Sequence, residues 1–192
     1  MKLLKWTGIV FLLLTTLSFL IPKGGPNWFR ERSKYLTGYP DTYEIVVDFS
    51  KPSCQDRLFI YKFSEEADLI YSGVVLHGCG GKSTPSKPEF SNEIGSNCSS
   101  LGKYTLEGIV KMKNGMEAIK LKGWSDTNSN AEKRGIYIHP SIMATLLPFN
   151  LPGVNFPLTN SSEGCFAVSY HTYYMVKHYM NINNKIILYA YN

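Results

Sequence analysis

The sequence lacks the motifs that mark several large classes of function. No glycine-rich phosphate-binding or dinucleotide-binding pattern follows an apolar strand and opens a helix, which argues against a nucleotide-binding enzyme. No C-x-x-C or H-x-x-x-H pair is present, so the spacing of a zinc site is missing even though His77 and Cys79 lie close together in the chain. We therefore expect neither a metal nor a cofactor.

Charged residues are also scarce. They make up 18% of the 192 residues, and 20 Lys and Arg against 15 Asp and Glu leave a formal net charge of +5. This excess is too small to form a basic patch, so we expect no nucleic-acid partner. No internal repeat or low-complexity tract is visible, and the length and composition suit one domain with its own core. We expect a monomer.

The apolar run near the N-terminus is short for a membrane span. Lys2 and Lys5 precede 16 uncharged, mostly apolar residues, 6–21, and no cysteine follows them for a lipid anchor. As a helix this run would span about 24 Å, less than the roughly 30 Å of a bilayer's hydrocarbon core. We expect export to the periplasm or cell envelope, with an inner-membrane tether if the run is not cleaved. The predicted divisions are a signal peptide or membrane anchor over 1–21, a linker over 22–41 and one domain over 42–192.

The rest of the chain is rich in residues typical of strands and turns. It has 13 Tyr, 10 Phe, 16 Gly and 10 Pro. The longest apolar segment, 69–76, is predicted to be a central strand, and the Asn114–Gly115 pair predicts a hairpin turn. The other expected elements are strands at 43–48, 57–63, from 99 onward, 116–122, 135–138, 166–168 and 185–191, a long loop over 78–97, and a helix over 170–181. This pattern predicts a mainly β sandwich or small barrel of mixed strands with one late α-helix.

Two residues in the second half carry the strongest chemical signal. His139 follows the alternating strand 135–138, and Cys165 opens the apolar segment 166–168 directly after Gly164. A cysteine and a histidine at such positions can form a thiolate–imidazole pair, in which the cysteine is the nucleophile and the histidine moves the proton. A glycine before the nucleophile lets a substrate carbonyl approach the backbone N–H groups.

Other polar residues are candidates for binding substrate. His77 either supports the pocket or caps a strand beside a glycine-rich loop. Arg134 either holds a substrate carboxylate as a bidentate partner or is a surface charge at the start of a strand. Further polar groups, expected near the cleft for substrate binding or loop hydrogen bonds, are Ser91, Asn92, Ser99, Ser100 and Ser162.

Four cysteines in an exported protein favour a disulfide. If Cys165 stays free as a nucleophile, then Cys54, Cys79 and Cys98 remain. Cys79 and Cys98 flank one Gly/Ser/Pro-rich loop, so we prefer that pair, although sequence alone does not determine the connectivity.

Several segments, in order, resemble the murein L,D-transpeptidase catalytic-domain family of bacterial envelope enzymes, from about residue 43 to residue 191. The matching segments are DFSKPS at 48–53, RLF at 57–59, HG at 77–78, FSN at 90–92, SSLGKY at 99–104, RGIYIH at 134–139 and SSEGCFAV at 161–168. The resemblance implies an L,D-transpeptidase-like fold. It also implies peptidoglycan stem peptides as the substrates.

The resemblance also implies a mechanism. Cys165 attacks a carbonyl in the tetrapeptide stem and expels the terminal D-alanine, and His139 serves as general base and then general acid. The carbonyl of Pro140 orients His139, and the N–H groups of Gly164 and Cys165 form the oxyanion hole. A second stem's amine then resolves the thioester to give a cross-link.

Two residues depart from the family pattern. Pro140 stands where a small residue, often Gly, is usual, and Glu163 stands where His or Trp is common. A carboxylate at Glu163 raises the pKa of the Cys165 thiol if the two side chains meet. Two alternatives therefore stay open beside transpeptidation: hydrolytic trimming of the stem by an L,D-carboxypeptidase, and a catalytically inactive cell-wall-binding domain.

Overall fold

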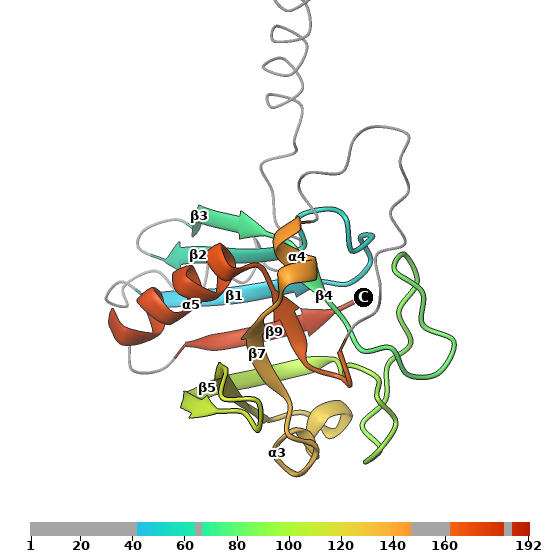
Figure 1. The fold of residues 1–192 in the computed structure, drawn as a ribbon. Coiled ribbons are helices and arrows are strands. Elements are labelled where there is room, and N and C mark those ends of the chain that lie inside the picture. Colours follow the sequence, from blue (N-terminus) through green and yellow to red (C-terminus); the bar gives the residue numbers. More distant parts are fainter. Residues whose placement is uncertain (1–41, 64–66, 147–161, 183–185) are drawn as a thin grey trace, which may run out of the picture.

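The computed structural model describes residues 42–63, 67–146, 162–182 and 186–192. Nine strands form one mixed sheet in the order β3-β2-β1-β9-β5-β6-β7-β8-β4 (Figure 1). The β1–β9 and β7–β8 pairs are parallel and the other pairs are antiparallel. The strands are β1 Thr42–Asp48, β2 Leu58–Phe63, β3 Ala67–Gly73, β4 Val75–Leu76, β5 Gly102–Lys111, β6 Glu117–Gly123, β7 Tyr137–Pro140, β8 Phe166–Val168 and β9 Ile187–Tyr191.

The two ends of this sheet come from one continuous stretch of chain. β3 and β4 stand at opposite ends of the strand order, yet only Val74 separates them in sequence. Because one residue spans less than about 4 Å, the sheet must curl until its two ends meet. Inward side chains of eight strands accordingly share one apolar cluster, with Ile45, Tyr104 and Phe166 among its fully buried members. The predicted mainly β, sandwich-like or barrel-like architecture is confirmed.

The expected single central strand over 69–76 is wrong. The chain breaks at Val74 into β3, at one end of the sheet, and β4, at the other. β3 is partly open to solvent, and Leu69 is 40% exposed. Gly73 allows the break to pack tightly, because a Cβ there would lie 2.5 Å from Thr172 Oγ1.

The predicted hairpin at Asn114–Gly115 is confirmed. β5 and β6 pair from Tyr104 opposite Gly123 to Lys111 opposite Glu117. Gly115 has φ 81°, a conformation that favours glycine, and the Asn114 Oδ1 accepts a hydrogen bond from the Met116 N–H at 3.1 Å.

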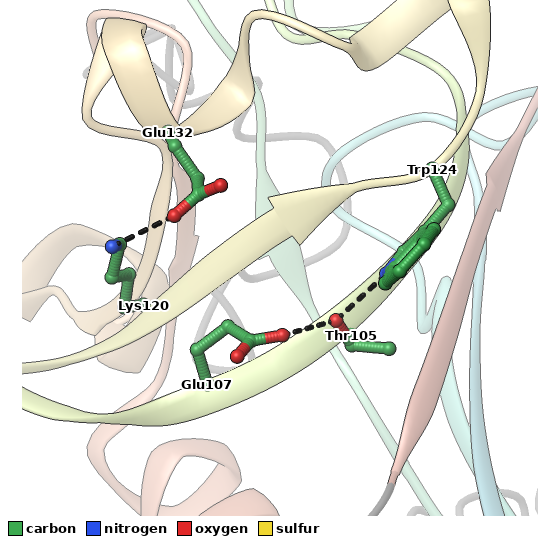
Figure 2. Close-up of polar contacts among 5 residues, drawn as sticks. All are labelled: Thr105, Glu107, Lys120, Trp124 and Glu132. Atoms are coloured by element: carbon green, nitrogen blue, oxygen red, sulfur yellow. Dashed lines mark hydrogen bonds and ion pairs between the residues drawn. The ribbon is translucent and has the colours of Figure 1, made fainter.

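Polar side chains cover the outer face of this hairpin. Trp124 donates from Nε1 to Thr105 Oγ1 at 2.9 Å, and Lys120 pairs with Glu132 at 2.9 Å (Figure 2). Lys120 is also the β6 partner of Tyr137 on β7, so this polar face continues toward the second half of the sheet.

One longer helix packs against the curled sheet, and three short helical segments lie between β6 and β7 or directly after β7. The predicted late helix is confirmed as α5, Tyr170–Ile182 (Figure 1). Its Tyr173 and Val176 side chains belong to the main core. Three short helical segments were not expected from the sequence: η1 Asp126–Asn128, α3 Ala131–Arg134 and α4 Ile142–Leu146. α3 ends at Gly135, whose φ of 66° turns the chain into β7.

The predicted leader over 1–21 and linker over 22–41 lie outside the described residues. Within the described part of the chain, no helix has both the length and the apolar character needed to cross a membrane.

Candidate active site

The candidate base lies on β7, and the candidate nucleophile directly precedes the neighbouring parallel strand β8. β7 and β8 pair with Ile138 opposite Phe166 and His139 opposite Ala167. Ile138 and Phe166 point into the main core. Since side chains alternate along a strand, His139 faces away from that core. Cys165 directly precedes β8, and its thiol contacts the backbone of Gly135 and Tyr137 beside it.

Cys165 is held by backbone groups of the segment beside it. Its Sγ donates to the Gly135 carbonyl at 3.4 Å and accepts from the Tyr137 N–H, also at 3.4 Å. The side chain is 9% exposed. Burial raises the pKa of the Cys165 thiol, and the charge of Glu163 adds to this, while the Tyr137 N–H and the charge of Arg134 oppose it. The resting group is therefore a neutral thiol at neutral pH, and neither of these two bonds involves His139.

His139 is half-buried, and one of its ring nitrogens is already engaged. Nδ1 lies 3.1 Å from the carbonyl oxygen of Pro140, the next residue. A carbonyl only accepts, so Nδ1 carries the proton and Nε2 keeps its lone pair. Pro140 lacks an N–H but supplies this carbonyl, so the departure from the usual small residue does not remove the acceptor.

A tight turn before Cys165 is tied down by two serine hydroxyls. Ser162 Oγ donates to the Cys165 carbonyl at 2.7 Å, and Ser99 Oγ donates to the Gly164 carbonyl at 3.0 Å. Gly164 has φ 112°, and a Cβ there would lie 2.8 Å from the Cys98 carbonyl oxygen. The Gly164–Cys165 peptide bond is trans, so its N–H points in the opposite direction to its C=O. Because the Gly164 C=O faces Ser99, the N–H of Cys165 points away from Ser99, toward the opposite side of the turn.

Arg134 organises the loop that packs on this turn. Its guanidinium donates to the carbonyl of Ser91 at 2.6 Å, to the carbonyl of Cys98, and to the hydroxyls of Ser96 and Ser100, both at 3.3 Å. A Cβ at Gly164 would lie 3.1 Å from Arg134 Nη2, so the same cation also lies against the nucleophile turn. These bonds occupy the guanidinium nitrogens that would hold a substrate carboxylate in one of the two sequence-based interpretations of Arg134.

His77 lies in the interior, next to a buried arginine. Its exposure is 0%, its Nδ1 accepts from Arg57 Nη2 at 2.7 Å, and its Nε2–H donates to the Thr84 carbonyl at 3.0 Å. Burial, and after it the charge of Arg57, lowers the pKa of His77 to about 4. Burial also lowers the pKa of Arg57 to about 9, so Arg57 stays charged and His77 neutral at pH 7. Both His77 nitrogens are engaged within the protein.

The remaining predicted residues connect loops. The Nδ2 of Asn92 donates to the Asp126 carbonyl at 2.8 Å and to Ser129 Oγ at 3.0 Å, and its Oδ1 accepts from the Asn130 N–H at 3.1 Å. Ser100 is buried and exchanges a 2.7 Å hydrogen bond with the hydroxyl of Tyr104. Ser91, besides its carbonyl bond to Arg134, accepts from the Glu93 N–H at 3.1 Å.

Sequence analysis missed one part of the site. Tyr137, whose backbone N–H contacts the thiol, also lines a cavity of about 470 Å³ together with Glu163 and the tip of the β5–β6 hairpin. The signal available in the sequence was the alternation in strand 135–138, which places Tyr137 and His139 on one face. Nothing local to the hairpin reveals that its tip reaches this strand. The hairpin residues in the lining are Val110, Lys111, Met112, Lys113 and Asn114.

The preferred disulfide is absent. All four cysteines are free thiols, with Cys54 and Cys79 exposed and Cys98 and Cys165 buried. Cys79 therefore faces solvent, whereas Cys98 is only 5% exposed, and the expected Cys79–Cys98 pairing is corrected to two separate thiols.

Comparison with known proteins bears on the identity of this site. A family model described as L,D-transpeptidase catalytic domain matches residues 30–191, beginning inside the stretch predicted as a linker. No curated protein matches the chain. The match spans every strand of the sheet and both residues of the candidate pair. It confirms the resemblance seen in the motifs, and the chain belongs to the L,D-transpeptidase catalytic-domain family.

Proposed function

We propose that this protein is a cysteine-dependent L,D-transpeptidase of the periplasm or cell envelope that joins peptidoglycan stem peptides. The observation that carries the proposal is the position of Cys165 directly before β8, next to the parallel strand β7 that carries His139. The family match supports the reaction class, and peptidoglycan lies in the envelope, to which the N-terminal charge and apolar pattern would direct the chain.

The backbone geometry is compatible with contact between the two side chains. Adjacent strands lie about 4.8 Å apart and two residues along a strand cover about 6.6 Å, so the Cβ atoms of His139 and Cys165 are separated by roughly 8 Å. A thiol and an imidazole that extend toward each other span most of that distance. Activation then requires a change of the Cys165 χ1 rotamer, which moves Sγ from the Gly135 carbonyl toward His139 Nε2.

The first half-reaction forms an acyl-enzyme. His139 Nε2 takes the thiol proton, and Sγ forms a bond to the carbonyl carbon of the diamino-acid residue in the stem. The C–N bond to the terminal D-alanine breaks, and the proton held by His139 passes to the leaving amine. The Cys165 N–H, turned away from Ser99, stabilises the oxyanion of the tetrahedral intermediate.

The second half-reaction transfers the acyl group. A neutral amine of a second stem forms a C–N bond to the thioester carbon while the C–S bond breaks. The amine's proton passes through His139 to the sulfur, which restores the thiol. Water in place of the amine gives a shortened stem, which is the L,D-carboxypeptidase outcome.

Intact-mass measurement of the protein with a tetrapeptide stem and with a carbapenem tests the proposal. We expect a covalent adduct on Cys165 in a Cys54→Ser/Cys79→Ser background, which removes the two exposed thiols. The Cys165→Ala change should abolish the adduct, and His139→Gln should slow its formation by about 10²- to 10⁴-fold. Mass spectrometry of the stems then separates cross-linked products from stems shortened by one alanine.

One observation favours a second candidate, a wall-binding domain without catalysis. The Cys165 thiol is buried, its pKa is raised, and its partners are Gly135 and Tyr137. If no adduct forms with either reagent while the protein still sediments with isolated peptidoglycan, this second function holds and the enzyme proposal is wrong.

A further inference from the structure

The outer face of β5 and β6 carries an exposed tryptophan that is held in one orientation. Trp124, directly after β6, is 60% exposed, and its Nε1–H donates to Thr105 Oγ1 at 2.9 Å (Figure 2). The Thr105 hydroxyl in turn donates to Glu107 Oε1 at 2.5 Å. An exposed side chain usually keeps its rotamer freedom, whereas here two hydrogen bonds in series fix the indole ring. The ring is ordered before any ligand arrives, which lowers the entropic cost of binding.

The fixed ring keeps surface open for stacking. Lys122 Nζ lies over the Trp124 ring, 4.8 Å from its centroid. Because Trp124 is still 60% exposed, this ammonium group does not cover the whole indole. A single exposed apolar side chain is ordinary, but a tryptophan is also the residue most often used as an anchor at binding surfaces. A flat apolar ring with polar groups at its edge suits a ligand that is apolar on one face and polar around its rim.

The charged groups around this ring balance one another. Lys120 pairs with Glu132 at 2.9 Å, and Lys122 and Glu107 add one charge of each sign. A surface without net positive charge does not attract a nucleic acid or an anionic lipid layer. Carboxylates accept hydrogen bonds and ammonium groups donate them, so the set matches the hydroxyl and amide groups of an uncharged sugar chain. We call this set the Trp124 face; it consists of Thr105, Glu107, Lys120, Lys122, Trp124 and Glu132.

The Trp124 face leads toward the candidate active site. Lys120 is the partner of Tyr137 on β7, and His139 lies two residues further along that strand. Because β6 and β7 are antiparallel, the direction from Trp124 to Lys120 is also the direction toward His139. Trp124 and Lys120 are four residues apart, about 13 Å at the spacing of a strand. A chain molecule that lies along the face therefore continues to the strand that carries the candidate base.

We propose that the Trp124 face binds the glycan strand of peptidoglycan, a chain of uncharged N-acetylated sugars. A sugar ring stacks its C–H face on the indole of Trp124, and its hydroxyl and acetamido groups bond Glu107 and Lys122 at the edge of the ring. Stems branch from the glycan, so a strand held here presents its stems toward Cys165. The choice of peptidoglycan among uncharged glycans rests on the proposed function, but binding at this face needs no acyl-enzyme.

Calorimetric titration with stem-free glycan strands, prepared from peptidoglycan with an amidase that removes the stems, tests the inference. In a Cys165→Ala background, Trp124→Ala should weaken the affinity at least tenfold. Thr105→Val keeps the ring but removes the acceptor of its N–H, and should weaken the affinity about threefold. Tyr174→Ala is the matched control, because Tyr174 is an aromatic residue on α5 with nearly the same exposure, 61%, and should leave the affinity unchanged. Thermal unfolding should show that all three variants stay folded.

Three results would overturn the inference. They are the failure of the Cys165→Ala protein to bind stem-free strands, equal affinities with and without Trp124→Ala, and a loss in Tyr174→Ala as large as that in Trp124→Ala. Equal affinities would leave the exposed indole to a protein partner instead. Acylation by a carbapenem involves no sugar and separates this inference from the proposed function. If acylation fails while the strands still bind through Trp124, the enzyme proposal is wrong and this inference stands; if acylation proceeds and the strands do not bind, the reverse holds.

Discussion

Ser99 Oγ donates a hydrogen bond to the carbonyl of Gly164, 65 residues further along the chain, at 3.0 Å. The same oxygen accepts from the Gly78 N–H at 2.9 Å, and Ser99 is completely buried. One hydroxyl therefore joins the end of the long loop, the chain just after β4 and the turn that carries Cys165. This contact orients the Gly164–Cys165 peptide.

Removing this hydroxyl should affect both stability and reactivity. Ser99→Ala leaves a buried carbonyl at Gly164 and a buried N–H at Gly78 without their partner, which costs about 1–3 kcal/mol in the free energy of unfolding. Because the Cys165 N–H then loses its orientation, acylation by a carbapenem should slow on the order of tenfold. Urea unfolding and stopped-flow acylation measure the two effects. Ser72→Ala, which removes an exposed hydrogen bond to Asp56, is the control and should be nearly neutral.

Gly164 is predicted to tolerate no side chain. Gly164→Ala combines a backbone conformation that disfavours a Cβ with a contact of 2.8 Å to the Cys98 carbonyl, and should cost roughly 3 kcal/mol or more. Gly108→Ala isolates the first effect, because φ is 134° there and nothing lies within 4 Å of the added Cβ. Thermal unfolding should therefore rank Gly164→Ala well below Gly108→Ala. Equal losses would show that the contact with the loop is unimportant.

The features predicted correctly from the sequence are those decided by neighbours in the chain. Asn114–Gly115 specifies its own turn chemistry, and the α5 segment buries Tyr173 and Val176 with helical spacing. The break at Val74 was missed because a continuous apolar run carries no sign of which strands it will pair with. That choice depends on partners about 100 residues away, such as Val168 for Val75.

The residues of the candidate site also fall into two groups, those whose place is decided by neighbours in the chain and those whose role depends on distant partners. The position of His139 on the outer face of β7 follows from strand alternation, and the position of Cys165 directly before β8 follows from the apolar segment 166–168, both local properties. The tasks of Arg134 and His77 do not, since their partners lie on other segments: Arg134 bonds the carbonyl of Ser91, and His77 accepts from Arg57. Sequence analysis treats a polar residue beside a cleft as exposed, whereas here folding surrounds His77 completely.

His77 should make the protein less stable in mild acid. Its pKa is about 4 when folded and about 6.5 when exposed, so as the pH falls below 6.5 the unfolded chain binds a proton that the folded protein excludes. The free energy of unfolding therefore decreases between about pH 6.5 and pH 4, by roughly 3 kcal/mol from this group, and below pH 4 the group adds no further change.

A neutral replacement isolates that effect. His77→Gln can still accept from Arg57 and donate to Thr84, but it does not titrate. Urea unfolding at pH 7 and pH 4.5 should show a smaller acid loss in His77→Gln than in the wild-type protein. A loss of the same size in both proteins would mean that other groups cause the acid sensitivity.

The reactivity of Cys165 should respond to the sign of the charges around it. Burial and the Glu163 carboxylate raise its pKa, so Glu163→Gln should lower that pKa and move the alkylation profile toward lower pH. Arg134→Met should move it the other way, because the guanidinium favours the thiolate. We expect the Glu163→Gln change to accelerate iodoacetamide modification at pH 7 by roughly two- to threefold, since an exposed carboxylate is partly screened by water.

The measurement requires the Cys54→Ser/Cys79→Ser background, and Glu89→Gln is the matched control, since Glu89 acts on Cys98 instead. Identical profiles for Glu163→Gln and Glu89→Gln would show that burial alone controls the thiol.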